Sequence, residues 1–216
     1  MKFSWTTATA VGLGAVVGLA WAAAPALHLR GDRFKPLAYE EMTPAQKTMI
    51  DHLLAGERRG STEGPFNVFL RSPEMGDAAQ QLGAQIRFHS SLPRKLNELA
   101  IITTARYWGA QFEWTAHRRS AAQAGVSDAT IEAIANGKRP SGLPPDEEAI
   151  YNFCHELLTT KQVSDATFQA AMNTVGERGT VDLIGAMGYY SLVSMALNVD
   201  RYPLVDGAKP ELKPLP

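Results

Sequence analysis

The chain has 216 residues, which is enough for one compact domain once any leader is removed. Its 21 basic and 22 acidic residues give a formal net charge of −1, so electrostatics offer no support for a nucleic-acid partner. The sequence has a single cysteine, which excludes a disulfide framework within the chain.

The N-terminus has the pattern of an export signal. Lys2 precedes an uncharged stretch that ends at Leu27, and Ala24-Pro25-Ala26 offers a small-x-small cleavage site. An uncleaved anchor is the alternative, because the apolar run is near the length that spans a bilayer. We therefore expect a signal peptide or anchor over residues 1–26 and a linker over 27–40. On this interpretation the protein is exported, and is either periplasmic or membrane-anchored.

The remaining residues contain repeated start and stop signals of helices and almost no strand signals. Thr43-Pro44-Ala45-Gln46 supplies an N-cap, a proline at the first helical position and a capping-box glutamine. A charged, Gly-rich loop is expected from Glu57 to Gly64. Further helices are expected to start near Ser72, Pro93, Gly109, Ser127, Pro144, Ser164 and Thr180. The sequence thus predicts an all-α domain over residues 41–205 and an extended tail over 206–216.

One pentapeptide occurs twice. Val126–Thr130 recurs identically as Val163–Thr167. Duplication of a helical unit would explain the repeat, and so would repeated use of a good helix start. The sequence leaves both explanations open.

The stretch from Glu98 to Gly125 carries polar groups where a core would be apolar. Glu98 opens the apolar run Leu99-Ala100-Ile101-Ile102, while Glu113 and His117 lie at i,i+4 and share a helix face. Two carboxylates near an imidazole form a reasonable set for proton transfer close to pH 7. A buried polar network that fixes helix packing is the structural alternative. A metal site with His89 as fourth ligand is a third interpretation.

This stretch resembles the carboxymuconolactone decarboxylase family, which includes the alkylhydroperoxidase D-like proteins. That family has a Glu in a run like Glu-Leu-Ala-Ile and then a helix with Cys-x-x-Cys-x-x-x-His. Glu98 and His117 match this pattern, whereas Ala110 and Glu113 stand at the two cysteine positions. The resemblance runs from about residue 64 to 198 and is sharpest over 94–125. It implies an alkylhydroperoxidase D-like helical fold, Glu98 brought close to His117, and a homo-oligomer, either a trimer or a hexamer.

The missing thiols direct the functional interpretation towards the decarboxylase branch of the family. We expect a cofactor-free acid/base lyase or isomerase that acts on a small lactone or oxo-acid. His117 is the expected proton donor or acceptor, Glu113 its partner acid, and Glu98 the group that orients the imidazole. The alternatives are an alkylhydroperoxidase-like peroxidase and a non-catalytic binding protein on the same fold.

Further residues are candidates for contact with the substrate. Arg106 could bind a carboxylate through its planar guanidinium, although a surface ion pair is the simpler explanation. His89 and Trp114 could line a pocket, although aromatic residues at this density also fit a core or a subunit interface. One of Tyr189 and Tyr190 could hydrogen-bond to substrate. Cys154 has the helical spacing of a small buried core residue.

Overall fold

The computed structural model describes residues 25–58, 60–204 and 208–214, and these residues contain helices and no strands. The all-α fold expected from the sequence is confirmed. A 3₁₀ helix, η1 (Tyr39–Glu41), precedes the α-helices of the described chain. These are α1 (Pro44–Ala55), α2 (Phe66–Phe69), α3 (Pro73–Phe88), α4 (Arg94–Tyr107), α5 (Gln111–Ala124), α6 (Asp128–Ala135), α7 (Pro145–Thr160) and α8 (Asp165–Asp200).

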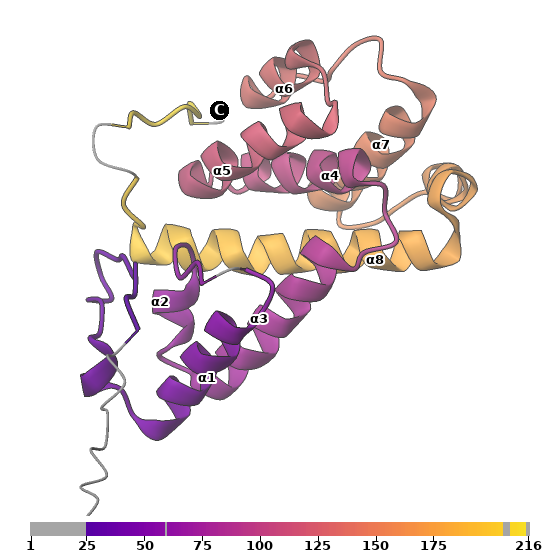
Figure 1. The fold of residues 1–216 in the computed structure, drawn as a ribbon. Coiled ribbons are helices and arrows are strands. Elements are labelled where there is room, and N and C mark those ends of the chain that lie inside the picture. The colour runs from indigo at the N-terminus through magenta and orange to yellow at the C-terminus, as the bar shows by residue number, and fades with distance from the viewer. Residues whose placement is uncertain (1–24, 59, 205–207, 215–216) are drawn as a thin grey trace, which may run out of the picture.

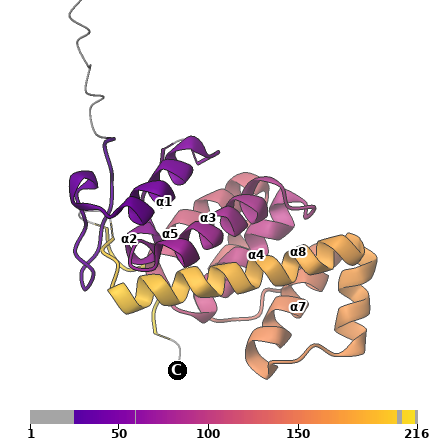
Figure 2. The same ribbon diagram turned by 90° about the horizontal axis from the view of Figure 1, so that it is seen from below.

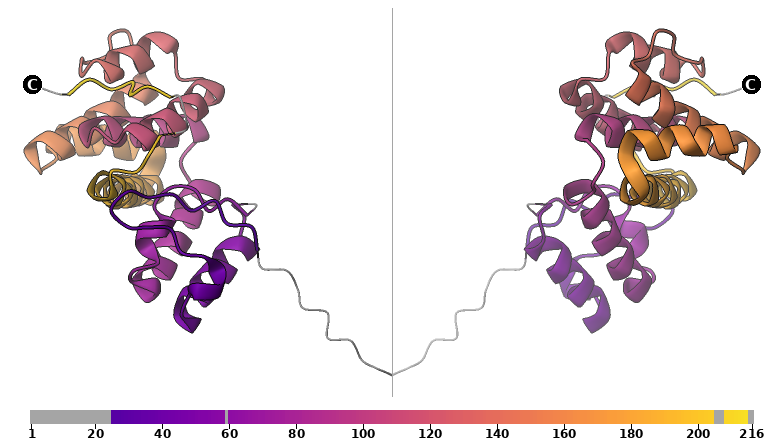
Figure 3. Two further views of the ribbon diagram at one scale, coloured as in Figure 1. Left: turned by 90° about the vertical axis from the view of Figure 1, so that its left-hand side faces the viewer. Right: turned by 90° about the vertical axis from the view of Figure 1, so that its right-hand side faces the viewer.

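Helix α8 is the axis of the domain. It separates α1–α3 on one side from α4–α7 on the other (Figure 1), and the end-on views in Figure 3 show it between these two groups. From below, it runs the length of the domain beside α3 and α4 (Figure 2). Its residues enter the apolar clusters on both sides, for example Tyr189 and Leu183. The long apolar helix therefore joins the two halves into one folded unit.

Local capping explains why several helices begin and end where the sequence predicts. Thr43 and Gln46 form the predicted capping box at the start of α1. Ser127 and Ser164 accept hydrogen bonds from the backbone three residues ahead, at the starts of α6 and α8. Gly125 ends α5 with φ of 98°, a conformation that favours glycine. The repeated pentapeptide thus serves as a helix start in both copies.

The range of α8 contains two helical segments that meet at a kink, as the sequence predicts. The first starts after Ser164, and the second starts after the non-helical Gly176, shortly before the predicted start at Thr180. Gly176 has φ of 71° and ψ of −177°, which glycine tolerates and other residues resist. The Thr180 hydroxyl donates to the Gly176 carbonyl at 2.8 Å, so this threonine lies one turn inside the helix.

The predicted linker packs against the domain. The Phe34 N–H donates to Oδ1 of the buried Asp200 at 2.7 Å, and Asn67 donates to the Phe34 carbonyl at 2.6 Å. Leu27, Leu29 and Leu37 contact the core between α1, α2 and α8. Residues 27–40 are therefore part of the folded unit, because their scattered apolar side chains find partners far along the chain.

The tail lies extended over the surface, as predicted for the part that the structure describes. We call residues 208–214 the C-terminal strap. The side chain of Gln111 bonds to the backbone of Glu211 and Leu212, and Leu212 is buried in the cluster that contains Trp114. The strap therefore holds the N-terminal end of α5 against the domain.

Most of the predicted leader, residues 1–24, lies outside the described residues. Among the described helices, α8 has the length and apolar composition to cross a membrane, and 56% of its most apolar window is buried inside the domain. Because α8 packs against helices on both sides, this apolar character matches its position in the core.

Candidate active site

Helices α4 and α5 bring the predicted acid/base residues together. Every residue of α4 from Leu96 to Arg106 is buried, so Glu98 lies inside the protein. Its Oε2 is 2.8 Å from Nδ1 of His117 on α5. On the other side of the ring, Nε2 lies 3.4 Å from Oε1 of Glu113, one turn earlier on the same helix. The imidazole therefore bridges two buried carboxylates.

This arrangement favours the protonated form of His117. Burial disfavours a charged imidazole and is the largest single influence on its pKa. The opposing interactions with Glu113 and Glu98 together outweigh burial and raise the pKa of His117 to about 9. The ring is thus an imidazolium at neutral pH, with one N–H directed to each carboxylate.

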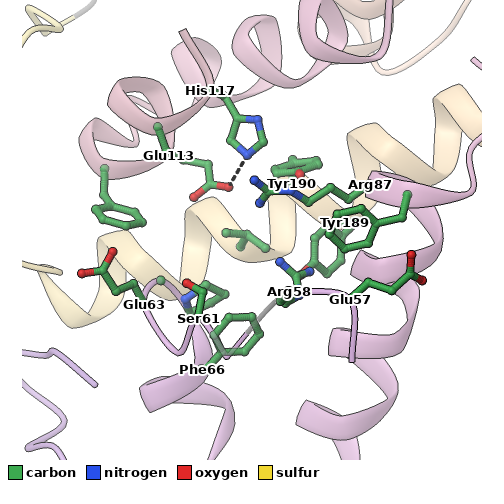
Figure 4. A pocket seen from close by; sticks show the side chains of 16 residues that line it. Glu57, Arg58, Ser61, Glu63, Phe66, Arg87, Glu113, His117, Tyr189 and Tyr190 are labelled. Atoms are coloured by element: carbon green, nitrogen blue, oxygen red, sulfur yellow. Dashed lines mark hydrogen bonds and ion pairs between the residues drawn. The ribbon is translucent and has the colours of Figure 1, made fainter. Parts of the chain in front are cut away.

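A pocket with a volume of about 720 Å³ opens beside this set (Figure 4). Glu113 and His117 contribute to its wall from α5, whereas Glu98 lies behind the ring. Tyr190 meets the His117 ring edge to face, with ring centroids 4.8 Å apart. Burial, followed by the nearby carboxylate of Glu113, raises the pKa of Tyr190 well above its usual value, so its hydroxyl stays protonated. The remaining lining residues come from α2, α3, α5, α8 and the segment between α1 and α2: Glu57, Arg58, Ser61, Glu63, Gly64, Pro65, Phe66, Arg87, Phe88, Phe112, Ala116, Tyr189 and Val193.

The structure places the three predicted substrate contacts outside this pocket. Arg106 donates to the Lys213 carbonyl at 2.8 Å, and Trp114 donates to the Glu211 carboxylate at 3.1 Å, so both are engaged by the C-terminal strap. His89 follows the last residue of α3 and pairs with Glu57 at the protein surface. Trp114 points away because α5 turns its Glu113–His117 face to the pocket and its Trp114 face to the strap. Arg106 lies near the end of α4 and is held there by the strap.

Other residues reach the pocket from parts of the chain that the sequence did not single out. Arg58 comes from the segment after α1 and Arg87 from the end of α3. No spacing rule connects these arginines to the Glu113–His117 helix, since they meet it only through tertiary packing. Tyr189 and Tyr190, both considered from the sequence, do line the pocket.

The described residues give no support to a metal or thiol centre here. Among them, no group of three or more His, Cys, Asp or Glu side chains has an arrangement that could hold a metal ion. Cys154 lies in the separate cluster between α4, α7 and α8, and its burial raises the pKa of the thiol. The prediction that Cys154 is a buried core residue is confirmed.

Comparison with known proteins identifies the relatives of this domain. The sequence profile of the carboxymuconolactone decarboxylase family matches residues 73–153, which span α3 to α7 and include the Glu98–His117 pair. This part of the chain is therefore similar to that family. Members of the carboxymuconolactone decarboxylase family include enzymes, and the helical scaffold described above is one on which enzymes are built. No curated protein matches the sequence significantly.

Solved structures share the fold of this chain at low sequence identity. An alkylhydroperoxidase AhpD core, a peroxidase-related protein from Ralstonia eutropha JMP134, has a TM-score of 0.64 at 13% identity, covering 81% of this chain and 92% of that one. The debrominase Bmp8 gives 0.61 at 11% identity, covering 80% and 92%. ATU0492 from Agrobacterium tumefaciens, a protein of unknown function associated with antioxidant defence and AhpD, gives 0.55 at 15%, covering 66% and 100%.

The structure shows the surroundings of the two residues that replace the cysteines of the family's pattern. Of the two residues that the sequence resemblance aligns with the cysteines, Ala110 is buried at the N-cap of α5 and Glu113 directs its carboxylate towards His117. A carboxylate–imidazole pair therefore faces the pocket.

Proposed function

We propose that this protein is a cofactor-free acid/base lyase or isomerase that acts on a small lactone or oxo-acid. The observation that carries the proposal is the buried imidazolium held between Glu98 and Glu113 at the wall of a pocket. A proton held on a buried ring at neutral pH is available to a carbanion or enolate that forms beside it.

Glu98, Glu113 and His117 have different roles in the proposed reaction because they lie on different sides of the imidazole ring. Glu98 lies behind the ring and accepts from Nδ1, so it fixes the orientation of the imidazole and holds its positive charge. Nε2 points towards the pocket with Glu113. In a decarboxylation, the electron pair of the breaking carbon–carbon bond enters the substrate carbonyl as an enolate while CO₂ leaves. His117 then gives its Nε2 proton to the carbon, and a proton from water in the pocket returns to the ring past the Glu113 carboxylate.

A peroxidase is the second candidate, because structures with this fold include proteins described as peroxidase-related. A disulfide-cycling peroxidase needs two thiols, and this sequence has the single buried Cys154. The residues at the pocket therefore favour proton transfer over thiol chemistry. A binding protein without catalysis remains the third candidate, and the test below separates all three.

The test is proton NMR in D₂O with a panel of carboxylated lactones and β-oxo acids. Deuterium gain or CO₂ loss in the wild type should fall by roughly 10²-fold or more in His117→Ala. His155→Ala is the matched control, because His155 is exposed on α7 outside the pocket. Full activity in His117→Ala would refute the assignment. Peroxide reduction that is lost in Cys154→Ser would favour the peroxidase.

A further inference from the structure

The pocket contains positive charge that the acid/base set does not use. Arg58 and Arg87 both line it, and neither makes an ion pair with any described residue. The other carboxylates of the lining have their own partners, since Glu57 pairs with His89 and Glu63 with Arg30. Within the described residues, these two guanidinium groups thus face a partly enclosed space without an ion-pair partner.

Arg58 is held in place although it has no acidic partner. Its Nη2 donates to the Tyr189 hydroxyl at 3.3 Å, and its guanidinium lies 5.1 Å from the centre of the Phe66 ring. Its Nε is buried and has no hydrogen-bond partner within the described chain. A buried donor without an acceptor is unfavourable, and an oxyanion in the pocket would satisfy it.

The two arginines converge on the same tyrosine. Burial raises the pKa of Tyr189, while the positive charges of Arg58 and Arg87 oppose this effect, which places both within electrostatic range of the hydroxyl. Figure 4 shows both guanidinium groups pointing into the pocket that Glu113 and His117 also line. The two arginines therefore form a cationic side of the pocket that holds the acid/base set.

Gly83 on α3 makes room for this arrangement. A Cβ at that position would lie 2.2 Å from the Tyr189 hydroxyl and 2.6 Å from Nη2 of Arg58. Any larger residue would displace the hydrogen-bonded pair. The close approach of the α3 backbone is thus part of how the cationic side is built.

We propose that Arg58 and Arg87 bind a carboxylate that anchors the substrate. The inference rests on the proposed function in one respect, namely that the reacting carbon of the same molecule lies near His117. The anchored carboxylate differs from any carboxylate that leaves as CO₂, because ion pairing holds electrons on the oxygens. Glu57, Glu63 and Glu113 share the pocket, so a singly charged carboxylate suits it better than a phosphate dianion. The substrate class is then an acid with a second reactive group, and a neutral lactone is excluded.

Binding of a matched pair of probes to the full chain tests the proposal. The probes are 4-oxopentanoate and its neutral methyl ester, with inorganic phosphate as a third arm, and affinity is measured by calorimetry or ligand-observed NMR. The acid should bind at least about tenfold tighter than the ester. Arg58→Gln and Arg87→Gln should each weaken binding of the acid roughly 10- to 100-fold and leave the ester unchanged.

Controls separate this proposal from the proposed function. Arg94→Gln, at an exposed arginine of α4 outside the pocket, should bind the acid as the wild type does. Arg87 is itself exposed, so its variant should fold and carry the test even if Arg58→Gln does not. Equal affinity for acid and ester, tighter binding of phosphate than of the acid, or unchanged binding by Arg87→Gln would overturn the carboxylate site. If His117→Ala binds the acid normally and no substrate turns over in the wild type, the carboxylate site stands and acid/base catalysis fails.

Discussion

Replacing Glu98 with glutamine removes one of the two carboxylates that hold a proton on His117. Burial would otherwise lower the pKa of the ring, which instead rises to about 9 from 6.5 because of Glu113 and Glu98. The difference, 9 − 6.5 = 2.5, corresponds to about 3 kcal/mol. Loss of one buried counter-charge should lower the pKa of His117 by about 1–3 units.

The sign of the effect on stability follows from where the proton is bound. Since the folded-state pKa lies above the unfolded value, the native protein keeps a proton that the unfolded chain releases between about pH 6.5 and pH 9. This contribution to the free energy of unfolding is complete below about pH 6.5 and is lost as pH rises through about 9. In Glu98→Gln the loss across this window should shrink by at least about 1.4 kcal/mol.

Urea unfolding at pH 6.5 and pH 9, together with an NMR titration of the His117 ring, measures both quantities. Comparing the variant with the wild type cancels other groups that titrate in the same range. Asp77→Asn is the matched control, because Asp77 pairs with His52 at the surface and should leave the His117 titration unmoved. The reasoning fails if wild type and Glu98→Gln lose equal stability between the two pH values.

Three further predictions follow from packing and burial. Gly83→Ala should lower the stability by about 1–3 kcal/mol through overpacking against Tyr189, whereas Gly188→Ala, which faces open space on α8, should not; equal melting temperatures would contradict this. The thiol of Cys154 should react with an alkylating reagent only after unfolding, since burial raises its pKa, and rapid labelling of the native protein would contradict the buried position. We expect the predicted homo-oligomer to assemble through exposed apolar side chains of α8; Ile184→Glu should reduce the mass measured by sedimentation, and an unchanged mass would refute this contact. These side chains are Val181, Ile184, Met195 and Val199.

Features that depend on a few neighbouring residues could be predicted from the sequence. The capping box at Thr43, the helix starts at Ser127 and Ser164 and the C-cap at Gly125 use hydrogen bonds that close within one turn. The i,i+4 pair of Glu113 and His117 follows from helical geometry in the same way. The contact with Glu98, 19 residues earlier in the chain, was implied by the family resemblance and could not be read from spacing.

Features that depend on tertiary packing could not be predicted in this way. Arg58 lies in a Gly-rich loop whose sequence does not show which helix it will face, and the pocket forms only when α3, α5 and α8 meet. Arg106 is predicted to bind substrate because of its planar guanidinium, but in the structure this group donates to the Lys213 carbonyl of the C-terminal strap. The sequence of residues 27–40 predicts a linker because its apolar side chains follow no period, although Leu27, Leu29 and Leu37 pack against the core.

The C-terminal strap has a practical consequence for anyone who trims or labels this protein. Truncation after residue 207 would remove the acceptor of the Trp114 indole, uncover the cluster that Leu212 fills, and release the side chain of Gln111. Both Gln111 and Trp114 lie within two positions of Glu113, so the cut would loosen the first turn of the helix that carries the pocket carboxylate. We expect a shortened protein to lose activity although every residue of the pocket remains. An affinity tag fused at this end is expected to disturb the same contacts of the strap.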